Sequence, residues 1–242
     1  MYSNRSHIAS LLTVVCAVLF GMEGSGMRIG NTGAFLTGKL PYDSEVEYLE
    51  STGPQWIDTG VFGNLHTRIE IVIEVANFTD HYALCGFLLS GSSAQITVPA
   101  NYNDAGLYAR FGDKLISGGM VVSEGKHTFT SDRSGLTIDG VSRGTFGATA
   151  NFTTPSSLAI FRFKGLNRNF FIGRMFSCKF HDGSSLVRDL IPVRFTNEQG
   201  QSEGAMYDRA NPTVGMNPDG SARTDGLYRN RGMGAFTWAK KT

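Results

Sequence analysis

The segment spanning residues 68–75, RIEIVIEV, alternates in polarity along its whole length. Because successive side chains of a strand point to opposite faces, Ile69, Ile71, Ile73 and Val75 share one face, while Arg68, Glu70, Val72 and Glu74 share the other. The pattern predicts a strand with one buried and one solvated face. Such a strand requires a second layer to cover its apolar side.

Comparable short runs recur along the chain with turn residues between them. We expect further strands at 45–49, 82–89, 95–98, 107–111, 126–131, 136–138, 158–163, 169–180 and 186–195. Asp139-Gly140 and Asp182-Gly183 are typical of hairpin turns. Outside the N-terminal segment, no capped run of ten residues has helical periodicity. These features predict an all-β fold, an antiparallel two-sheet jelly-roll sandwich.

The N-terminus differs from the rest of the chain. Residues 1–26 have a polar start, an apolar run at 8–20 and a small-residue end, the layout of a secretory signal peptide. The alternative is an uncleaved hydrophobic arm. The run is shorter than the roughly 20 residues of a membrane-spanning helix, so we expect no membrane span in the mature chain. Residues 27–44 are a Gly-rich linker or arm, and residues 45–242 form the sandwich domain.

The charge balance bears on the partner. The chain has 22 Lys and Arg against 21 Asp and Glu, a net charge of +1. Nucleic-acid-binding proteins usually carry a basic excess or stripe, so no nucleic-acid partner is expected. Cys85 and Cys178 both lie in apolar runs. They are either buried free thiols or one disulfide.

Three stretches carry a resemblance to a known domain type: EYLESTGPQWIDTG (47–60), SCKFHDGSSLVRDLIPVR (177–194) and AMYDRANPT (205–213), with GAFTWA (234–239) near the end. Together they resemble the LamG/concanavalin A-like jelly-roll domains of phage tail or fibre proteins and gut-bacterial surface proteins, over residues 45–239. Asn211-Pro212-Thr213 departs from the usual Asn-Gly, which affects only a local turn. Within the first stretch, we interpret 51–54 and 58–60 as turns, and Val46, Tyr48, Trp56 and Ile57 as core residues.

The resemblance implies a concanavalin A-like sandwich that is not an enzyme. Related glucanases place three acids on alternate residues of one strand, whereas Glu70 and Glu74 flank Val72. At about 3.3 Å per residue the two carboxylates are roughly 13 Å apart, which is too far for glycoside hydrolysis. The histidines at 66, 81, 127 and 181 have no nucleophile at a suggestive spacing, and the chain has no G-x-S-x-G motif. We expect no catalytic residues.

No cofactor and no metal site is expected. Calcium is an alternative, because the loops at 101–104, 132–134 and 217–220 are rich in oxygen-bearing side chains. Asp, Asn and Gly also dominate ordinary turns, and this interpretation is preferred.

Carbohydrate-binding sites combine aromatic faces with amide, carboxylate or guanidinium groups. The candidate ligand-binding residues are Trp56, Tyr102, Asn103, Asp104, Tyr108 and Arg110. Trp238 is a further candidate, and core packing is the alternative role of Trp56. Arg162, Lys164 and Arg168 lie close together in FRFKGLNRN. They could bind an anionic glycan, but the preferred interpretation is a solvated loop.

The sequence therefore predicts a lectin-like adhesion module that binds a glycan or cell-surface polysaccharide, secreted or at the cell surface, alternatively on a virion. A structural component of a phage tail or surface assembly, with a homo-oligomer or assembly partner, is the first alternative. A glycoside hydrolase is the second.

Overall fold

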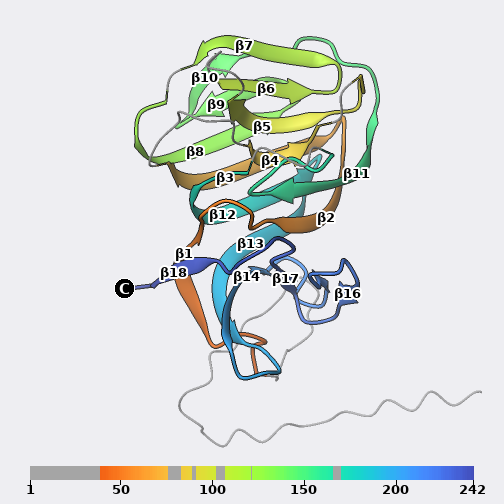
Figure 1. Cartoon of the computed structure of the whole chain (residues 1–242). Coiled ribbons are helices and arrows are strands. Elements are labelled where there is room, and N and C mark those ends of the chain that lie inside the picture. Colours follow the sequence, from red (N-terminus) through yellow and green to blue (C-terminus); the bar gives the residue numbers. More distant parts are fainter. Residues whose placement is uncertain (1–38, 76–82, 89–90, 102–106, 121, 166–169) are drawn as a thin grey trace, which may run out of the picture. The chain divides into compact units, whose positions relative to one another are not determined.

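A computed structural model describes residues 39–242 except 76–82, 89–90, 102–106, 121 and 166–169 (Figure 1). Its strands form two sheets, and the predicted all-β sandwich is confirmed; among the described strands the pairing is antiparallel except between residues 216 and 228. The smaller sheet has the order β2-β11-β4-β5-β6-β7. Its strands are β2 (Ile57–Asn64), β4 (Ala83–Phe87), β5 (Ile96–Asn101), β6 (Leu107–Phe111), β7 (Lys114–Met120) and β11 (Thr153–Ile160).

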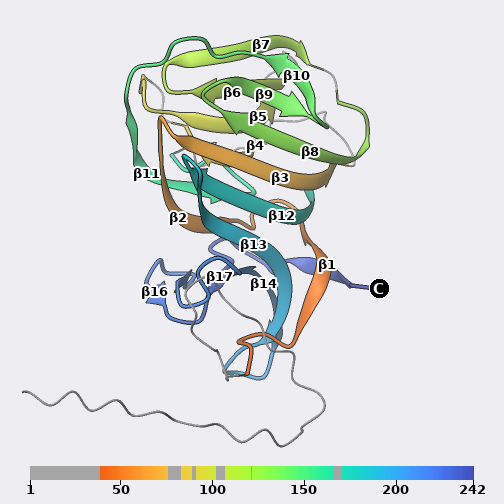
Figure 2. The same cartoon turned by 180° about the vertical axis from the view of Figure 1, so that it is seen from behind.

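The larger sheet has the order β10-β9-β8-β3-β12-β1-β13-β14-β17-β15-β16, and β18 also pairs with β1. Seen from behind, β3, β8, β12 and β13 run across the molecule as one twisted layer (Figure 2). The strands are β1 (Ser44–Ser51), β3 (Thr67–Val75), β8 (Gly125–Asp132), β9 (Gly135–Ile138), β10 (Val141–Gly144), β12 (Gly173–Asp182), β13 (Ser185–Thr196), β14 (Ser202–Asp208), β15 (Gly215–Met216), β16 (Ala222–Arg223), β17 (Leu227–Arg229) and β18 (Thr237–Lys240).

The core lies between the two sheets. Ile69, Ile71 and Ile73 of β3 are fully buried, as their alternation predicts, and they share one apolar cluster with side chains of the smaller sheet such as Leu84 and Val98. Each such side chain stabilises the fold by about 1.5–3 kcal/mol relative to an exposed position. The alternation along β3 thus determines which face of the larger sheet the smaller one covers.

Both predicted Asp-Gly hairpins are present. Asp139 and Gly140 have φ values of 53° and 76° between β9 and β10. Two successive positive φ values match the right-handed twist of the flanking strands, which is why Asn-Gly and Asp-Gly are favoured there. The second hairpin joins β12 and β13, and Gly183 (φ 59°) follows Asp182 at the end of β12.

The stretch EYLESTGPQWIDTG crosses from one sheet to the other. Its first half is in β1 of the larger sheet, and its end is in β2 of the smaller sheet. The buried Gln55 holds the crossing: its Oε1 accepts hydrogen bonds from Ser51 Oγ and the Thr52 amide, both at 3.1 Å, and its Nε2 donates to the Ala235 carbonyl at 3.2 Å. The predicted turn at 51–54 lies within this crossing.

The predicted polar turn at 58–60 is wrong. Asp58 and Thr59 are buried residues of β2, and Asp58 pairs with Ala159 of β11. Thr59 Oγ1 donates to the Leu158 carbonyl at 2.8 Å. Polar side chains that are buried and satisfied by distant partners look like turn residues in a sequence, which explains the error.

Cys85 and Cys178 are both buried and are not bridged to each other. Cys85 lies on β4 and Cys178 on β12, so the two thiols come from opposite sheets of the same core cluster. Burial raises the pKa of Cys178 well above its ordinary value, and the neighbouring Cys85 thiol adds to the rise. The structure thus agrees with the prediction of free, buried thiols and not with that of a disulfide.

Candidate functional site

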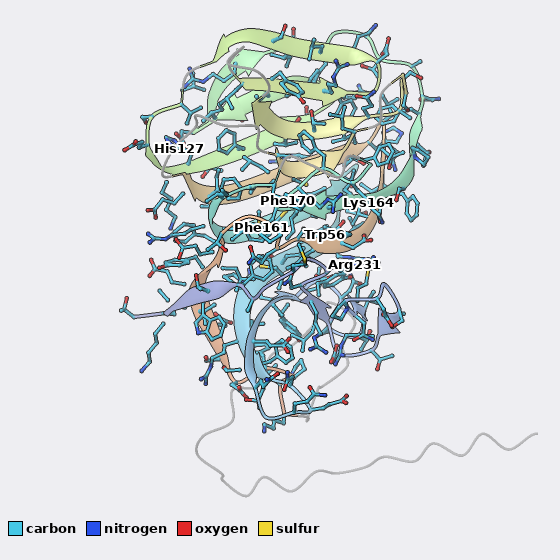
Figure 3. The ribbon with its side chains drawn as sticks, in the orientation of Figure 1. Trp56, His127, Phe161, Lys164, Phe170 and Arg231 are labelled. Atoms are coloured by element: carbon cyan, nitrogen blue, oxygen red, sulfur yellow. The ribbon has the colours of Figure 1, made fainter. Side chains whose placement is uncertain are left out.

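A polar and aromatic cluster forms where the chain enters the smaller sheet. The sheet-to-sheet crossing and β2 supply Trp56 and Asp58. Ser157 comes from β11, and Arg162 and Lys164 come from the segment that follows it. Arg231 lies between β17 and β18. Figure 3 shows Trp56, Lys164, Phe170 and Arg231 in one region of the molecule. We name this set the Trp56 cluster: Trp56, Asp58, Ser157, Arg162, Lys164, Phe170 and Arg231.

The carboxylate of Asp58 organises the cluster. Its Oδ2 accepts hydrogen bonds from Lys164 Nζ at 2.6 Å and from Arg231 Nη1 at 2.9 Å. Its Oδ1 accepts from Ser157 Oγ at 2.6 Å and from the Gly60 amide at 3.1 Å. The Asp58 side chain is only 3% exposed, whereas those of Lys164 and Arg231 are 26% and 22% exposed. A buried anion therefore holds two cations at the protein surface.

The environment keeps Asp58 ionised. Burial by itself raises the pKa of Asp58, but the hydrogen bonds from Lys164, Ser157 and the Gly60 amide favour the carboxylate. Their combined effect lowers the pKa below the ordinary value for an aspartate. Asp58 is thus a charged anchor at neutral pH.

Two guanidinium groups lie against the indole of Trp56. Arg162 Cζ is 4.6 Å from the ring centroid, and Arg231 Cζ is 5.1 Å from it. Arg162 also lies 5.3 Å from the ring centroid of Phe170. Cation–π contacts of this kind contribute about 0.5–2 kcal/mol each. Trp56 packs against the core with part of its side chain and leaves the rest exposed, so core packing describes only part of its environment.

The two guanidiniums affect one another electrostatically. Burial lowers the pKa of Arg162, and the neighbouring charge of Arg231 lowers it further. A like charge so placed disfavours the charged form of Arg162. Two positive charges therefore lie against the indole of Trp56.

The backbone beside Arg162 is strained. Phe161 has a φ of 67°, which is uncommon for a residue other than glycine and costs on the order of 1–3 kcal/mol. Packing holds it there: its ring centroid lies 4.7 Å from that of Phe236 and 6.1 Å from that of Phe171. Its amide donates to the Leu84 carbonyl at 2.8 Å. The strain lies at the end of β11, where the chain turns toward Arg162 and Lys164.

A second, deeper polar group lies next to the cluster. Arg188 Nε is 3.6 Å from Asp208 Oδ2, and Asp208 is fully buried. In the part of the chain that the structure describes, Asp208 Oδ2 and the Tyr228 hydroxyl have no hydrogen-bond partner. Burial raises the pKa of Tyr228 to about 12; the Arg188 charge opposes this rise, and the Asp208 carboxylate adds to it.

The cluster suits binding better than proton transfer. Ser157 Oγ donates to Asp58 and accepts from Lys164 Nζ at 2.7 Å, which superficially resembles a serine–lysine pair. Lys164 Nζ donates to both Asp58 and Ser157, so it acts here as a hydrogen-bond donor and does not accept the proton of Ser157 Oγ, which goes to Asp58. Ser157 is also only 5% exposed. The arrangement can hold an anion or a polar ligand.

The predicted ligand-binding residues fall into three groups. Trp56 lies in the cluster. Tyr108 and Arg110 lie on β6: Tyr108 packs against Ala83 and Phe163, and the Arg110 amide donates to Thr97 Oγ1 at 2.9 Å. These contacts are with β4, β5 and the segment after β11. Tyr102, Asn103 and Asp104 lie outside the described residues. Trp238 lies on β18 opposite Leu49, apart from the contacts that make up the cluster.

The preferred interpretation of FRFKGLNRN as a solvated loop is wrong for two of its cations. Arg162 and Lys164 are half-buried and make specific contacts, whereas Arg168 lies outside the described residues. The sequence interpretation missed Asp58, Ser157 and Arg231 altogether. The IDTG end of the first motif contains Asp58, but its buried role depends on partners about a hundred or more residues away.

Glu70, Glu74 and the oxygen-rich loop at 217–220 have partners within the fold, whereas 102–104 lie outside the described residues. Glu70 is 2.7 Å from Arg68, and Glu74 is 3.0 Å from Arg174, both on the face opposite the buried isoleucines. In the loop at 217–220, Asp219 Oδ1 accepts from the Ser221 amide at 2.8 Å, as in an ordinary turn. Within the described residues, no three His, Cys, Asp or Glu side chains are grouped to hold a metal ion.

We compared the chain with models of known protein families and with curated protein sequences. Neither comparison finds a match. The described part of the chain also contains no helix of the length and hydrophobicity that a membrane span needs.

Proposed function

We propose that this protein is a non-catalytic binding module of the LamG/concanavalin A-like type, and that its ligand is a carbohydrate. One observation carries the proposal: the partly exposed indole of Trp56 is surrounded by hydrogen-bond donors that a buried carboxylate holds in place. Sugars bind where an aromatic side chain lies beside polar groups. Here the guanidiniums over the ring would meet the hydroxyls, and the part of the indole that they leave exposed would meet the C–H groups.

The rigidity of the cluster supports this function. Lys164 and Arg231 are tied to Asp58, and the Trp56 backbone is tied on both sides: its amide donates to Asn230 Oδ1 at 3.1 Å, and its carbonyl accepts from the Arg231 amide at 2.8 Å. Side chains that are already ordered lose less entropy when a ligand binds. Binding residues on loops of a rigid sandwich are a common arrangement.

We expect no hydrolysis. Glu70 and Glu74 are separated by Val72 and each forms an ion pair on the outer face of β3. Reducing-sugar release that disappears in Glu70→Gln or Glu74→Gln would instead favour a glycoside hydrolase. We place the protein outside the cell or on a virion, as the family resemblance implies. A purely structural role in a tail or surface assembly is the outcome if no glycan binds.

The fluorescence of Trp56 tests the proposal. The chain has two tryptophans, so Trp238→Phe leaves Trp56 as the only indole. Glycans found on an array would be titrated into this variant. We expect a change in Trp56 emission, and calorimetry of the Trp56→Ala variant should show at least tenfold weaker binding, about 1.4 kcal/mol. Failure of the folded protein to bind any glycan would overturn the proposal.

A further inference from the structure

Resting on the proposed function, we propose that the Trp56 cluster selects glycans with acid groups. The oxyanion, a sugar carboxylate or a sulfate ester, lies against Arg231 and Lys164 with Arg162 beside it. The sugar ring contacts the exposed part of Trp56. The cluster would therefore bind acidic sugars in preference to neutral ones.

The charge count at Asp58 is the first support. Lys164 and Arg231 both donate to the same oxygen, Asp58 Oδ2. The exposed carboxylate of Asp219 also lies within the electrostatic reach of Arg231. With Arg162 on the same indole, three cations face two carboxylates, which leaves one positive charge in excess at the surface. Both cations are more than a fifth exposed, so an anion in solution can reach them.

Unused donors are the second support. Arg231 Nε donates to the Pro218 carbonyl at 3.0 Å and Nη1 donates to Asp58, whereas Nη2 has no hydrogen-bond acceptor within the described ranges. Lys164 Nζ uses two of its three hydrogens, on Asp58 and Ser157. Charged N–H groups form their strongest hydrogen bonds with oxyanions, and the planar arginine matches a carboxylate or sulfate.

A glycine lies against the Arg231 guanidinium. A Cβ atom at Gly220 would lie 2.8 Å from Arg231 Nη2 and 2.9 Å from Nη1, so the guanidinium would have to move away from its present position. The bare backbone at Gly220 therefore lets the guanidinium lie where it reaches Asp58 and Trp56 together. The neighbouring Arg162 guanidinium is held against the same indole. An anion between the two arginines would relieve their repulsion.

Two matched polymer pairs test the charge preference. Dextran sulfate is compared with dextran, and polygalacturonate with its methyl ester, by calorimetry on the full chain at 0.15 M salt. We expect at least one charged polymer to bind tenfold more tightly than its neutral partner. The pair that responds distinguishes sulfate from carboxylate.

Variants then locate the binding. Arg162→Gln removes one charge without touching Asp58, and Arg231→Gln removes a second. Arg133→Gln, in the exposed turn between β8 and β9, is the matched control for net charge. We expect each cluster variant to weaken charged-polymer binding at least fivefold and the control to leave it unchanged. Thermal unfolding of each variant confirms that it is folded.

The outcomes separate the two proposals. Equal binding of charged and neutral polymers, or equal losses in Arg133→Gln and Arg162→Gln, would overturn the acid preference and leave glycan binding intact. A single-stranded DNA oligonucleotide that binds as tightly as dextran sulfate would also overturn it. No glycan binding at all would overturn the proposed function, and the acid preference with it.

Discussion

The ammonium group of Lys164 lies 2.6 Å from Asp58 Oδ2, although the two residues are 106 positions apart in the chain. Asp58 is on β2, and Lys164 follows the neighbouring strand β11. The same carboxylate also reaches Arg231, 173 positions away. This one side chain therefore ties three distant segments into the surface that contains Trp56.

Replacing Asp58 should destabilise the fold. In Asp58→Asn, Lys164 and Arg231 lose their shared anion, and Ser157 loses a charged acceptor. Breaking a buried pair by removing one partner costs about 3–5 kcal/mol. Because both cations keep contact with water, we expect a loss of roughly 2–3 kcal/mol in urea unfolding. Asp113→Asn, which removes an exposed pair with Lys114, should leave the unfolding curve nearly unchanged.

The same variant should change the response to acid. The pKa of Asp58 is lower in the folded state than in the unfolded chain, so its contribution to stability is fully present above the unfolded value near 3.9. That contribution is lost as the pH falls through the folded value. The stability gap between wild type and Asp58→Asn should be constant from pH 7 to pH 5 and should shrink below about pH 4. A gap that stayed constant at low pH would contradict this assignment.

Tyr228 should limit stability in alkali. An unfolded tyrosine ionises near pH 10, whereas the pKa of Tyr228 in the folded chain is about 12. Its contribution is present below pH 10 and is lost as the pH rises toward 12, by up to about 3 kcal/mol. Tyr228→Phe should match wild type within about 1 kcal/mol at pH 8, since within the described part of the chain the hydroxyl forms no hydrogen bond of good geometry and has the nearby Arg188 guanidinium to interact with. If both proteins lost stability in parallel above pH 10, the prediction would fail.

Gly220 and Gly200 provide a matched pair for the Arg231 contact. Both have positive φ values, 89° for Gly220 and 75° for Gly200. Each closes a turn of the same kind, in which the glycine amide donates to the carbonyl of the asparagine three residues earlier at 3.0 Å. A Cβ at Gly200 meets nothing, whereas one at Gly220 meets the Arg231 guanidinium. Both alanine variants should carry the backbone strain, about 1 kcal/mol or more. Only Gly220→Ala should also weaken glycan binding.

The fold was predictable wherever one face of a strand is uniformly apolar. The alternation in β3 and the Asp-Gly turns are local signals, and the structure has them where the sequence places them. The strand β2 was not predictable in this way, since its buried polar residues Asp58 and Thr59 read as a turn. Their burial depends on hydrogen bonds to β11, which no local pattern reveals.

The candidate site was predictable only in part. Trp56 was identified as an aromatic candidate, and Arg162 and Lys164 as a cationic group, but nothing in the sequence indicated that they meet. Arg231 follows Asn230 in a segment without regular periodicity, and its role arises from the contact with Asp58. Sites assembled from distant segments require the topology before the residues can be grouped.

The pairing of Glu50 has a consequence for how the chain reaches its native state. In β1, Glu50 lies opposite Arg174 of β12 and Thr237 of β18, and its bond to Thr237 spans 187 positions. At about 5–20 residues per second, a ribosome needs roughly 10–40 s to deliver that partner. Until then one edge of the earliest strand stays open to other chains, as unpaired edges do. Contacts so far apart in sequence also make folding slow, on the order of milliseconds to seconds. Because slowly folding chains with open strand edges can pair with one another, the yield of soluble recombinant protein should fall steeply as the expression temperature and the concentration of nascent chains rise.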